Sequence, residues 1–132
     1  MTATPGRSSL VSRLSARIGP AGRWVVVELS GEFDVATAPV LIGRTAALVA
    51  LPRPPRIALE VSQVTFCDSS GINALVRLWK QVGALGGELV VVRPGPRLAE
   101  LLARTGVDGP VRVVDAFGDV PGAGPAPSSP AW

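Results

Sequence analysis

The residues of this chain best suited to chemistry are the carboxylate and hydroxyls of the run Asp68-Ser69-Ser70-Gly71. A serine hydroxyl becomes a nucleophile for acyl transfer only beside a general base, and the chain contains no histidine. Its single lysine, Lys80, lies about three helical turns beyond Ser69, too far along a helix for a Ser-Lys pair. We therefore expect a non-enzymatic role for these serines, and the sequence does not predict an enzyme.

Composition also argues against metal and cofactor chemistry. Cys67 is the only cysteine, so a chain without histidine cannot supply the usual thiolate and imidazole ligands of zinc or the thiolates of an iron–sulfur cluster. The phosphate-binding patterns G-x-x-x-x-G-K-S/T and G-x-G-x-x-G after a strand are both missing. No metal and no cofactor is expected. We interpret Cys67 as a small buried hydrophobic residue.

The charge pattern disfavours nucleic acid and membrane partners. Thirteen basic and ten acidic residues give a net charge of +3, and the arginines are scattered rather than gathered in a stripe that could follow a phosphate backbone. The longest apolar stretches, such as residues 25–27 and 89–92, are far shorter than the ~20 residues that span a bilayer. With no signal-like segment, the expected location is cytoplasmic, without membrane insertion.

Hydrophobic periodicity predicts the elements that position the serines. A length of 132 residues with 47% hydrophobic residues predicts one domain with a true core. The order of elements predicts an α/β fold with a mixed sheet of four to five strands and three to four helices. A turn is expected at residues 19–22 and a break at 31–34. The expected strands are 10–18, 24–29, 57–61, 89–92 and 111–114, and the expected helices are 38–50, one that begins after Asp68 and ends before Gly86, and 98–106.

Local physics gives the run from Asp68 to Gly71 two interpretations, and both stay open. Asp and Ser side chains cap helix N-termini by accepting hydrogen bonds from the first free N–H groups. The same N–H groups and the helix dipole favour negative charge, so a phosphate on a hydroxyl there would cost the fold little. It would still add about −2 of charge to the surface, as a reversible switch requires. At the first helix, Thr37 is the expected N-cap.

Four segments, taken together, resemble motifs of STAS domains, the anti-sigma factor antagonists. Residues 31–39 (GEFDVATAP) resemble the stretch G-E-hydrophobic-D-x-x-T-A, and 64–72 (VTFCDSSGI) resemble the phosphorylation segment V-x-F-x-D-S-S/T-G-L. Residues 86–91 (GGELVV) resemble the G-G-x-L strand that follows, and Arg97 to Val107 resembles the segment of the third helix that ends in T-G-L. The resemblance covers about residues 10–117 and implies the family's small mixed sheet.

The resemblance implies roles for individual residues. Ser69 is the expected target of a partner anti-sigma serine kinase; Ser70 is the less favoured acceptor, with helix capping as its main role. Asp34 lies in a loop expected near the phosphorylation loop, where partner contact and capping of the first helix are equal alternatives. Asn73 departs from the small residue common there and borders the docking face. The implied partner-binding surface comprises Asp34, Asp68, Ser69, Ser70, Gly71 and Asn73.

The function implied is that of an anti-sigma factor antagonist. Unphosphorylated, it would bind an anti-sigma factor serine kinase and free the sigma factor; phosphorylation would end binding, and a serine phosphatase would reset it. The alternative is a STAS scaffold that is not phosphorylated, in a lipid-transport or stress-signalling complex. The domain is expected at residues 10–117, after a flexible N-terminus (1–9) and before a disordered tail rich in Pro, Gly and Ala (118–132).

Overall fold

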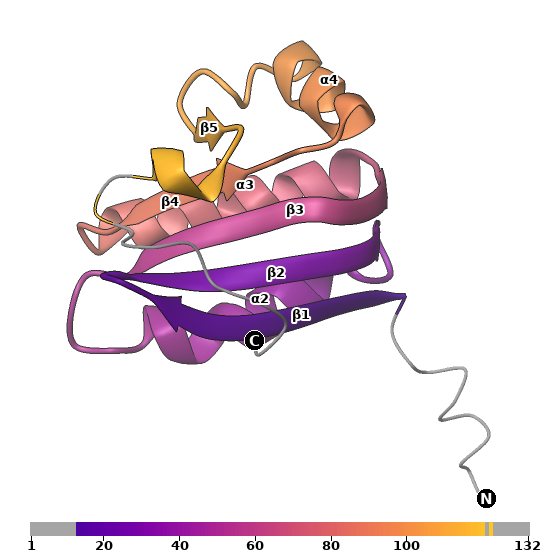
Figure 1. Cartoon of the computed structure of the whole chain (residues 1–132). Helices are drawn as coiled ribbons and strands as arrows, with labels where there is room; N and C mark the ends of the chain where they lie inside the picture. The colour runs from indigo at the N-terminus through magenta and orange to yellow at the C-terminus, as the bar shows by residue number, and fades with distance from the viewer. Residues whose placement is uncertain (1–12, 121, 123–132) are drawn as a thin grey trace, which may run out of the picture.

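The computed structural model of the chain describes residues 13–120 and 122, and a five-stranded sheet forms its centre (Figure 1). The strand order is β1-β2-β3-β4-β5; β1 runs antiparallel to β2, and each later pair is parallel. The predicted α/β fold with a mixed sheet is confirmed, with five strands and three α-helices among the described residues. The elements are β1 (Leu14–Ala21), β2 (Trp24–Phe33), α2 (Ala38–Val49), β3 (Arg56–Cys67), α3 (Ser69–Ala84), β4 (Glu88–Val92), α4 (Pro96–Arg104), β5 (Arg112–Val114) and the 3-10 turn η1 (Phe117–Asp119).

Helices α2 and α3 pack against each other behind the sheet as Figure 1 shows it. The larger core fills the space between them and the sheet, and includes Leu59 of β3 with Leu75 and Leu78 of α3. Leu98 and Leu102 of α4 are buried in the same cluster. Because β2 and β3 are neighbouring parallel strands, their carboxyl ends meet at one edge of the sheet, and each leads into a helix. This edge carries the candidate site.

The opposite face of the sheet carries a smaller core. Trp24 and Val26 of β2 pack there with Phe117 and Val120, and η1 lies in front of the sheet in Figure 1. Val120 is 3% exposed and packs in this core, so packed structure extends beyond residue 117, where the sequence predicts the domain to end.

The remaining predictions for the two ends cannot be compared with the fold. The expected flexible segment, residues 1–9, lies outside the described residues, as does the expected tail from residue 121 onward apart from Gly122. Within the part that is described, no helix combines the length and the apolar character that a bilayer crossing needs.

The first hairpin turns later than the sequence predicts. The expected turn at residues 19–22 is wrong for 19–21, because β1 continues to Ala21, which pairs with Trp24; Gly22 does lie in the turn. Pro20 is tolerated inside β1 since this is an edge strand, whose outer N–H groups need no ladder partner. Gly22, with φ 63°, then starts the two-residue turn.

Strands β2 and β3 are longer than expected, and this extends them to the site. The predicted break at residues 31–34 is wrong for 31–33, which continue β2, and the expected strand 57–61 is part of a strand that runs to Cys67. Two register shifts, at 28–30 and 31–32, accommodate the extra length. Gly31 takes φ 108°, where a Cβ would stand 1.8 Å from the carbonyl oxygen of Arg13. Only glycine fits this close approach.

The three- and four-residue spacing along α3 predicts one apolar face made of Ile72, Leu75, Val76, Trp79, Val82 and Leu85. Ile72, Leu75 and Val82 are buried and Val76 and Trp79 are half-buried, while Leu78, which this face did not include, is fully buried. Leu85, assigned to that face, is 45% exposed because it lies one residue beyond the last helical position. The buried face holds the helix against the core, and in its first turn Ser69 is exposed while Gly71 and Ile72 are buried.

Candidate functional site

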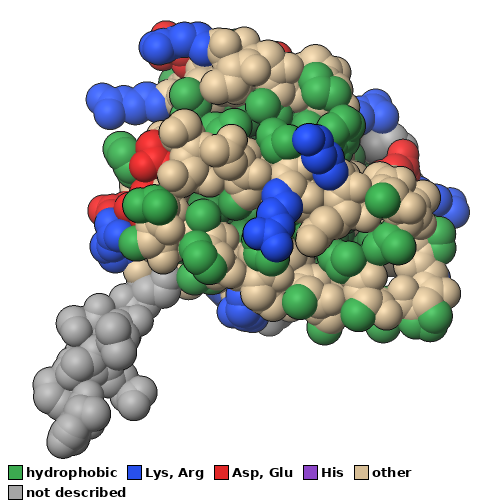
Figure 2. Space-filling view, turned by 180° about the vertical axis from the view of Figure 1, so that it is seen from behind, with side chains coloured by type: hydrophobic (Ala, Val, Ile, Leu, Met, Phe, Trp, Pro, Cys, Tyr) green, Lys and Arg blue, Asp and Glu red, His purple; other side chains and the backbone are tan. Residues whose placement is uncertain are grey.

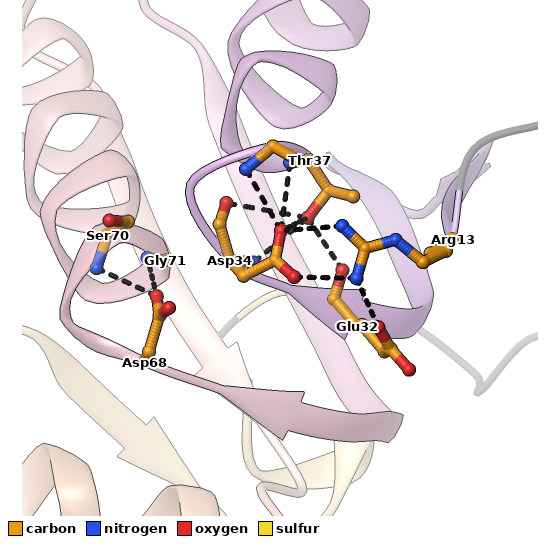
Figure 3. A network of polar contacts seen from close by, with 8 residues as sticks. Arg13, Glu32, Asp34, Thr37, Asp68, Ser70 and Gly71 are labelled. Atoms are coloured by element: carbon orange, nitrogen blue, oxygen red, sulfur yellow. Dashed lines mark hydrogen bonds and ion pairs between the residues drawn. The ribbon is translucent and has the colours of Figure 1, made fainter. Parts of the chain in front are cut away.

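Asp68 begins α3 and caps it. Its backbone is extended, and its Oδ1 accepts hydrogen bonds from the N–H groups of Ser70 at 2.9 Å and Gly71 at 3.3 Å (Figure 3). The expectation that Ser70 caps the helix is wrong, since Asp68 supplies the capping oxygen and Ser70 is one of its donors. An aspartate N-cap also places a negative charge at the positive end of the helix dipole, where it is stabilised.

The two serines differ in access. Ser69 is the first residue of α3 and is exposed, whereas Ser70 is half-buried. No carboxylate, histidine or lysine is within hydrogen-bond contact of the Ser69 side chain in the described structure. Ser69 thus presents a hydroxyl to solvent at a helix N-terminus, and no base among the described residues is in hydrogen-bond contact with it.

The end of β2 lies directly against the start of α3. The backbone N–H of Asp68 donates to the carbonyl oxygen of Phe33 at 3.3 Å. Gly71 lies so close that a Cβ there would be 2.5 Å from the same oxygen and 2.9 Å from the Cys67 Sγ. This contact brings the β2–α2 loop, which carries Asp34, beside the loop before Ser69, as the resemblance implied.

Asp34 braces its own loop rather than pointing free into solvent. Its Oδ1 accepts from the N–H groups of Ala36 at 3.0 Å and Thr37 at 3.1 Å, and its Oδ2 accepts from the Arg13 guanidinium at 2.9 Å (Figure 3). Arg13 also pairs with Glu32, and the side chain of Asp34 is only 13% exposed. Of the two alternatives for Asp34, the geometry favours ordering of the loop before α2.

Thr37 occupies the predicted N-cap position of α2, but its hydroxyl does not cap the helix. The hydroxyl donates to the carbonyl oxygen of Glu32 at 2.6 Å and accepts from the N–H of Asp34 at 2.9 Å. The carbonyl oxygen of Asp34 accepts from the N–H of Ala38, the first helical residue, at 2.7 Å. Hydrogen bonds within the β2–α2 loop therefore fix its backbone, and its outer surface keeps a defined shape.

Three groups at the site have shifted pKa values. The hydrogen bonds from the Arg13 guanidinium to Glu32 and Asp34 raise the pKa of Arg13. Partial burial raises the pKa of Asp34, but the hydrogen bond from the Thr37 N–H and the Arg13 guanidinium outweigh it, so the pKa lies below its ordinary value. Burial, with the nearby charge of Asp68, raises the pKa of the Cys67 thiol to about 12. Asp34 is therefore ionised and Cys67 is a neutral thiol at physiological pH. Cys67 is half-buried, so the burial predicted for it is only partial.

The structure gathers five of the six predicted partner-binding residues at the carboxyl ends of β2 and β3: Asp34, Asp68, Ser69, Ser70 and Gly71. Asn73 is exposed one turn further along α3. The sequence reasoning missed Arg13, which no motif marks, and two exposed hydrophobic side chains beside the site, Val35 at 74% and Phe66 at 51%. Val35 lies next to a turn and Phe66 near a strand end, and an apolar residue at such a position could have indicated an exposed hydrophobic side chain.

No group of three metal-ligating side chains gathers anywhere in residues 13–120. The arrangement combines an exposed hydroxyl, two loops held by hydrogen bonds and exposed apolar side chains. Exposed apolar side chains gathered on one surface are common where proteins bind other proteins.

Comparison with known proteins supports the fold and the resemblance to STAS domains. The family model for the STAS domain matches residues 16–120. The anti-sigma-B factor antagonist of Bacillus subtilis (strain 168) is 34% identical over 83 residues, which cover 63% of this chain and 74% of that protein.

Solved structures agree with this match. An anti-sigma factor antagonist from Mycobacterium paratuberculosis has a TM-score of 0.72 and 29% identity, covering 80% of this chain and 89% of that one. The anti-sigma factor antagonist SpoIIAA in its unphosphorylated form has a TM-score of 0.60 over 80% of this chain and 92% of its own, at 20% identity, a likeness of fold alone. Since the family model spans most of the chain and the sheet and helices agree, the chain belongs to the STAS domain family.

Proposed function

We propose that this protein is an anti-sigma factor antagonist controlled by phosphorylation of Ser69. In the unphosphorylated state it binds an anti-sigma factor that carries serine kinase activity, and the sigma factor is released. The kinase transfers the γ-phosphoryl group of ATP to the Ser69 Oγ, with loss of the hydroxyl proton and release of ADP. A serine phosphatase hydrolyses the phosphate and returns the protein to its binding state.

The observation that carries this proposal is the position of Ser69. Its hydroxyl is exposed on the first residue of α3, while both neighbouring loops are held by Asp68, Asp34 and the Phe33 carbonyl group. A kinase can therefore reach the hydroxyl without unfolding the domain. The names of the Bacillus subtilis and Mycobacterium paratuberculosis relatives, both anti-sigma factor antagonists, support the same assignment.

Electrostatics explain how one phosphate can end binding without disturbing the fold. The helix N-terminus tolerates the added charge of about −2. In a closed protein–protein interface the same charge would be desolvated without a partner, which costs roughly 3–5 kcal/mol. The switch thus acts on the complex and not on the free domain. The protein is proposed to act in the cytoplasm, as a binding partner and kinase substrate rather than as an enzyme.

The direct test is to incubate the full chain with ATP and its partner anti-sigma factor kinase and to measure intact mass. We expect one phosphate per chain, mapped by fragmentation to Ser69. Ser69→Ala should remain unmodified, and Ser70→Ala, the matched control one residue away, should still gain one phosphate. No mass change, or a phosphate that persists in Ser69→Ala, would contradict the proposal; no mass change would favour a scaffold that is not phosphorylated.

A further inference from the structure

A groove of about 490 Å³ runs between α2 and α3 and opens to solvent beside the candidate site. We call it the α2–α3 groove. Its walls are mostly apolar, with Val35 at its rim and Ser70 at the end where α3 begins. Further lining residues are Ala38, Pro39, Ile42 and Gly43 on the α2 side and Asn73 and Arg77 on the α3 side. The groove is therefore continuous with the turn that carries Ser69.

Gly43 lines the α2 side of this groove and leaves open space beside it. It lies inside α2, where glycine is less favourable than alanine because it leaves more backbone freedom to lose on folding. Its backbone does not have the positive φ that would require glycine, and a Cβ placed on it would have no atom within 4 Å. The fold thus gains nothing from glycine at this position, whereas a larger side chain would project into the groove.

Arg77, the one charged residue among those that line the groove, is basic. The carboxylates nearest the groove mouth, Asp34 and Asp68, are engaged with the Arg13 guanidinium and with the N-terminal N–H groups of α3. α2 and α3 contain no aspartate or glutamate. Arg77 lines the groove and Lys80 lies one turn further along α3, beside Arg77. Neither forms an ion pair with another described residue. Figure 2, which views the molecule from the helical side, shows hydrophobic and basic side chains over the middle of this face and acidic ones toward its margins.

We propose that the α2–α3 groove binds an amphipathic helix of the partner kinase whose apolar side chains fill the groove and whose carboxylates face Arg77 and Lys80. Helices that lie in a groove between two helices insert apolar side chains at spacings of three and four residues, and the flanking charges set the choice of partner. The α2–α3 groove has an apolar floor and an uncompensated basic wall, which matches an acidic helix and disfavours a basic one.

This inference rests on the proposed function and gives the switch a mechanism. Ser70 lines the end of the groove and Ser69 is its neighbour, so a phosphate on Ser69 would stand at the groove mouth. An acidic helix bound there would be repelled by the phosphate, while a neutral one would feel little effect. Phosphorylation would thereby release the partner by charge alone.

The test uses two designed peptides of about 16 residues, roughly four helical turns. Both carry leucines at helical spacing; one has glutamates and the other lysines at the flanking positions. By fluorescence anisotropy the acidic peptide should bind the full chain at least about tenfold more tightly than the basic one. Arg77→Glu should remove or invert this preference, and Ser69→Glu should weaken the acidic peptide selectively.

Filling the groove supplies the matched comparison. Gly43→Leu should abolish binding of the acidic peptide, whereas Gly83→Leu should not, because Gly83 also lies in a helix with no atom within 4 Å of an added Cβ but outside the groove. Thermal unfolding of both variants checks that they fold. Equal binding of the two peptides, no binding of either, or unchanged binding in Gly43→Leu would overturn the inference.

Two further outcomes distinguish helix binding in the groove from lipid binding there and from the proposed function. Binding of the chain to vesicles of phosphatidylcholine and phosphatidylglycerol, lost in Gly43→Leu and without peptide binding, would assign the groove to lipid and overturn the inference. Failure of the peptides together with normal phosphorylation of Ser69 by the kinase would overturn the groove assignment alone and leave the proposed function standing.

Discussion

Ser69→Glu is expected to lose at least about a hundredfold in affinity for the partner kinase, whereas Ser69→Ala is expected to bind it persistently. The glutamate brings an unpaired negative charge into the interface and, like a phosphate, has no nearby cation to neutralise it within α3's first turn. Alanine removes the acceptor hydroxyl and leaves the surface neutral. Both variants should keep the wild-type fold, because Ser69 is exposed and Asp68 supplies the helix cap. Affinities by calorimetry measure the difference.

Ser69→Gln is the matched control for this result. Glutamine has nearly the shape of glutamate and lacks its charge, so its binding should be much closer to that of Ser69→Ala. If Ser69→Gln and Ser69→Glu bound equally weakly, size rather than charge would explain the loss. If Ser69→Glu bound as well as Ser69→Ala, the electrostatic switch would be refuted.

Gly31→Ala is expected to destabilise the fold by more than about 2 kcal/mol. Gly31 has φ 108°, and a Cβ there would stand 1.8 Å from the carbonyl oxygen of Arg13 and 2.9 Å from its carbonyl carbon. Both obstructing atoms belong to the backbone, so no side-chain rotation can relieve the clash. The hydrogen bond from the Glu32 N–H to the same Arg13 oxygen, 2.9 Å long, would also be lost. Urea unfolding, followed by the fluorescence of the buried Trp24, measures the change.

Gly43→Ala, the same glycine-to-alanine change at another position, is expected to stabilise the fold rather than destabilise it. Its added Cβ meets no atom within 4 Å, and alanine is the better helix former, so the variant should gain roughly 0.5–1 kcal/mol of stability.

Gly31→Ala should additionally weaken kinase binding, since it displaces the loop that Asp34 orders. A stability of Gly31→Ala equal to that of the wild type would show that the approach of β1 to β2 at Arg13 is not as tight as described.

Local patterns made much of the fold predictable. The spacing of Ile72, Leu75 and Val82 predicts the helical period of α3. Asp68, a residue type that favours the N-cap position, directly precedes this helix. The β-branched run in β2 and the apolar run in β4 likewise predict strands from their own residues alone. These signals lie within a few residues of one another, so the order of strands and helices followed from them.

The errors come from interactions between distant segments. Whether Pro20 lies in a turn or a strand depends on β1 being an edge strand, which sheet topology decides. The lengths of β2 and β3 depend on register shifts in their pairing, which hydrophobic periodicity does not record. Arg13 reaches Asp34 across 21 residues of sequence because β1 pairs with β2. No spacing rule predicts that contact.

The candidate site shows the same division. The predicted capping side chain is confirmed at α3, where Asp68 accepts from two N–H groups, but not at α2, where Thr37 has the N-cap position and no side-chain capping bond. Rotamers and loop shape decide this difference. The Thr37 hydroxyl bonds to the backbone of Glu32 and Asp34. At α3 the capping side chain is Asp68 rather than Ser70. The proximity of the two loops was implied by the resemblance, and its physical basis is the close contact of Gly71 with the Phe33 carbonyl oxygen.

The most direct measurement follows modification and release together. The purified complex of the chain with its partner kinase is mixed with ATP, and phosphate on Ser69 by mass and dissociation by light scattering are recorded from the same samples. The account predicts that the complex dissociates in proportion to Ser69 phosphorylation and that the Ser69→Ala complex stays intact. A complex that persists after every Ser69 carries phosphate, or one that dissociates equally fast with Ser69→Ala, would contradict it.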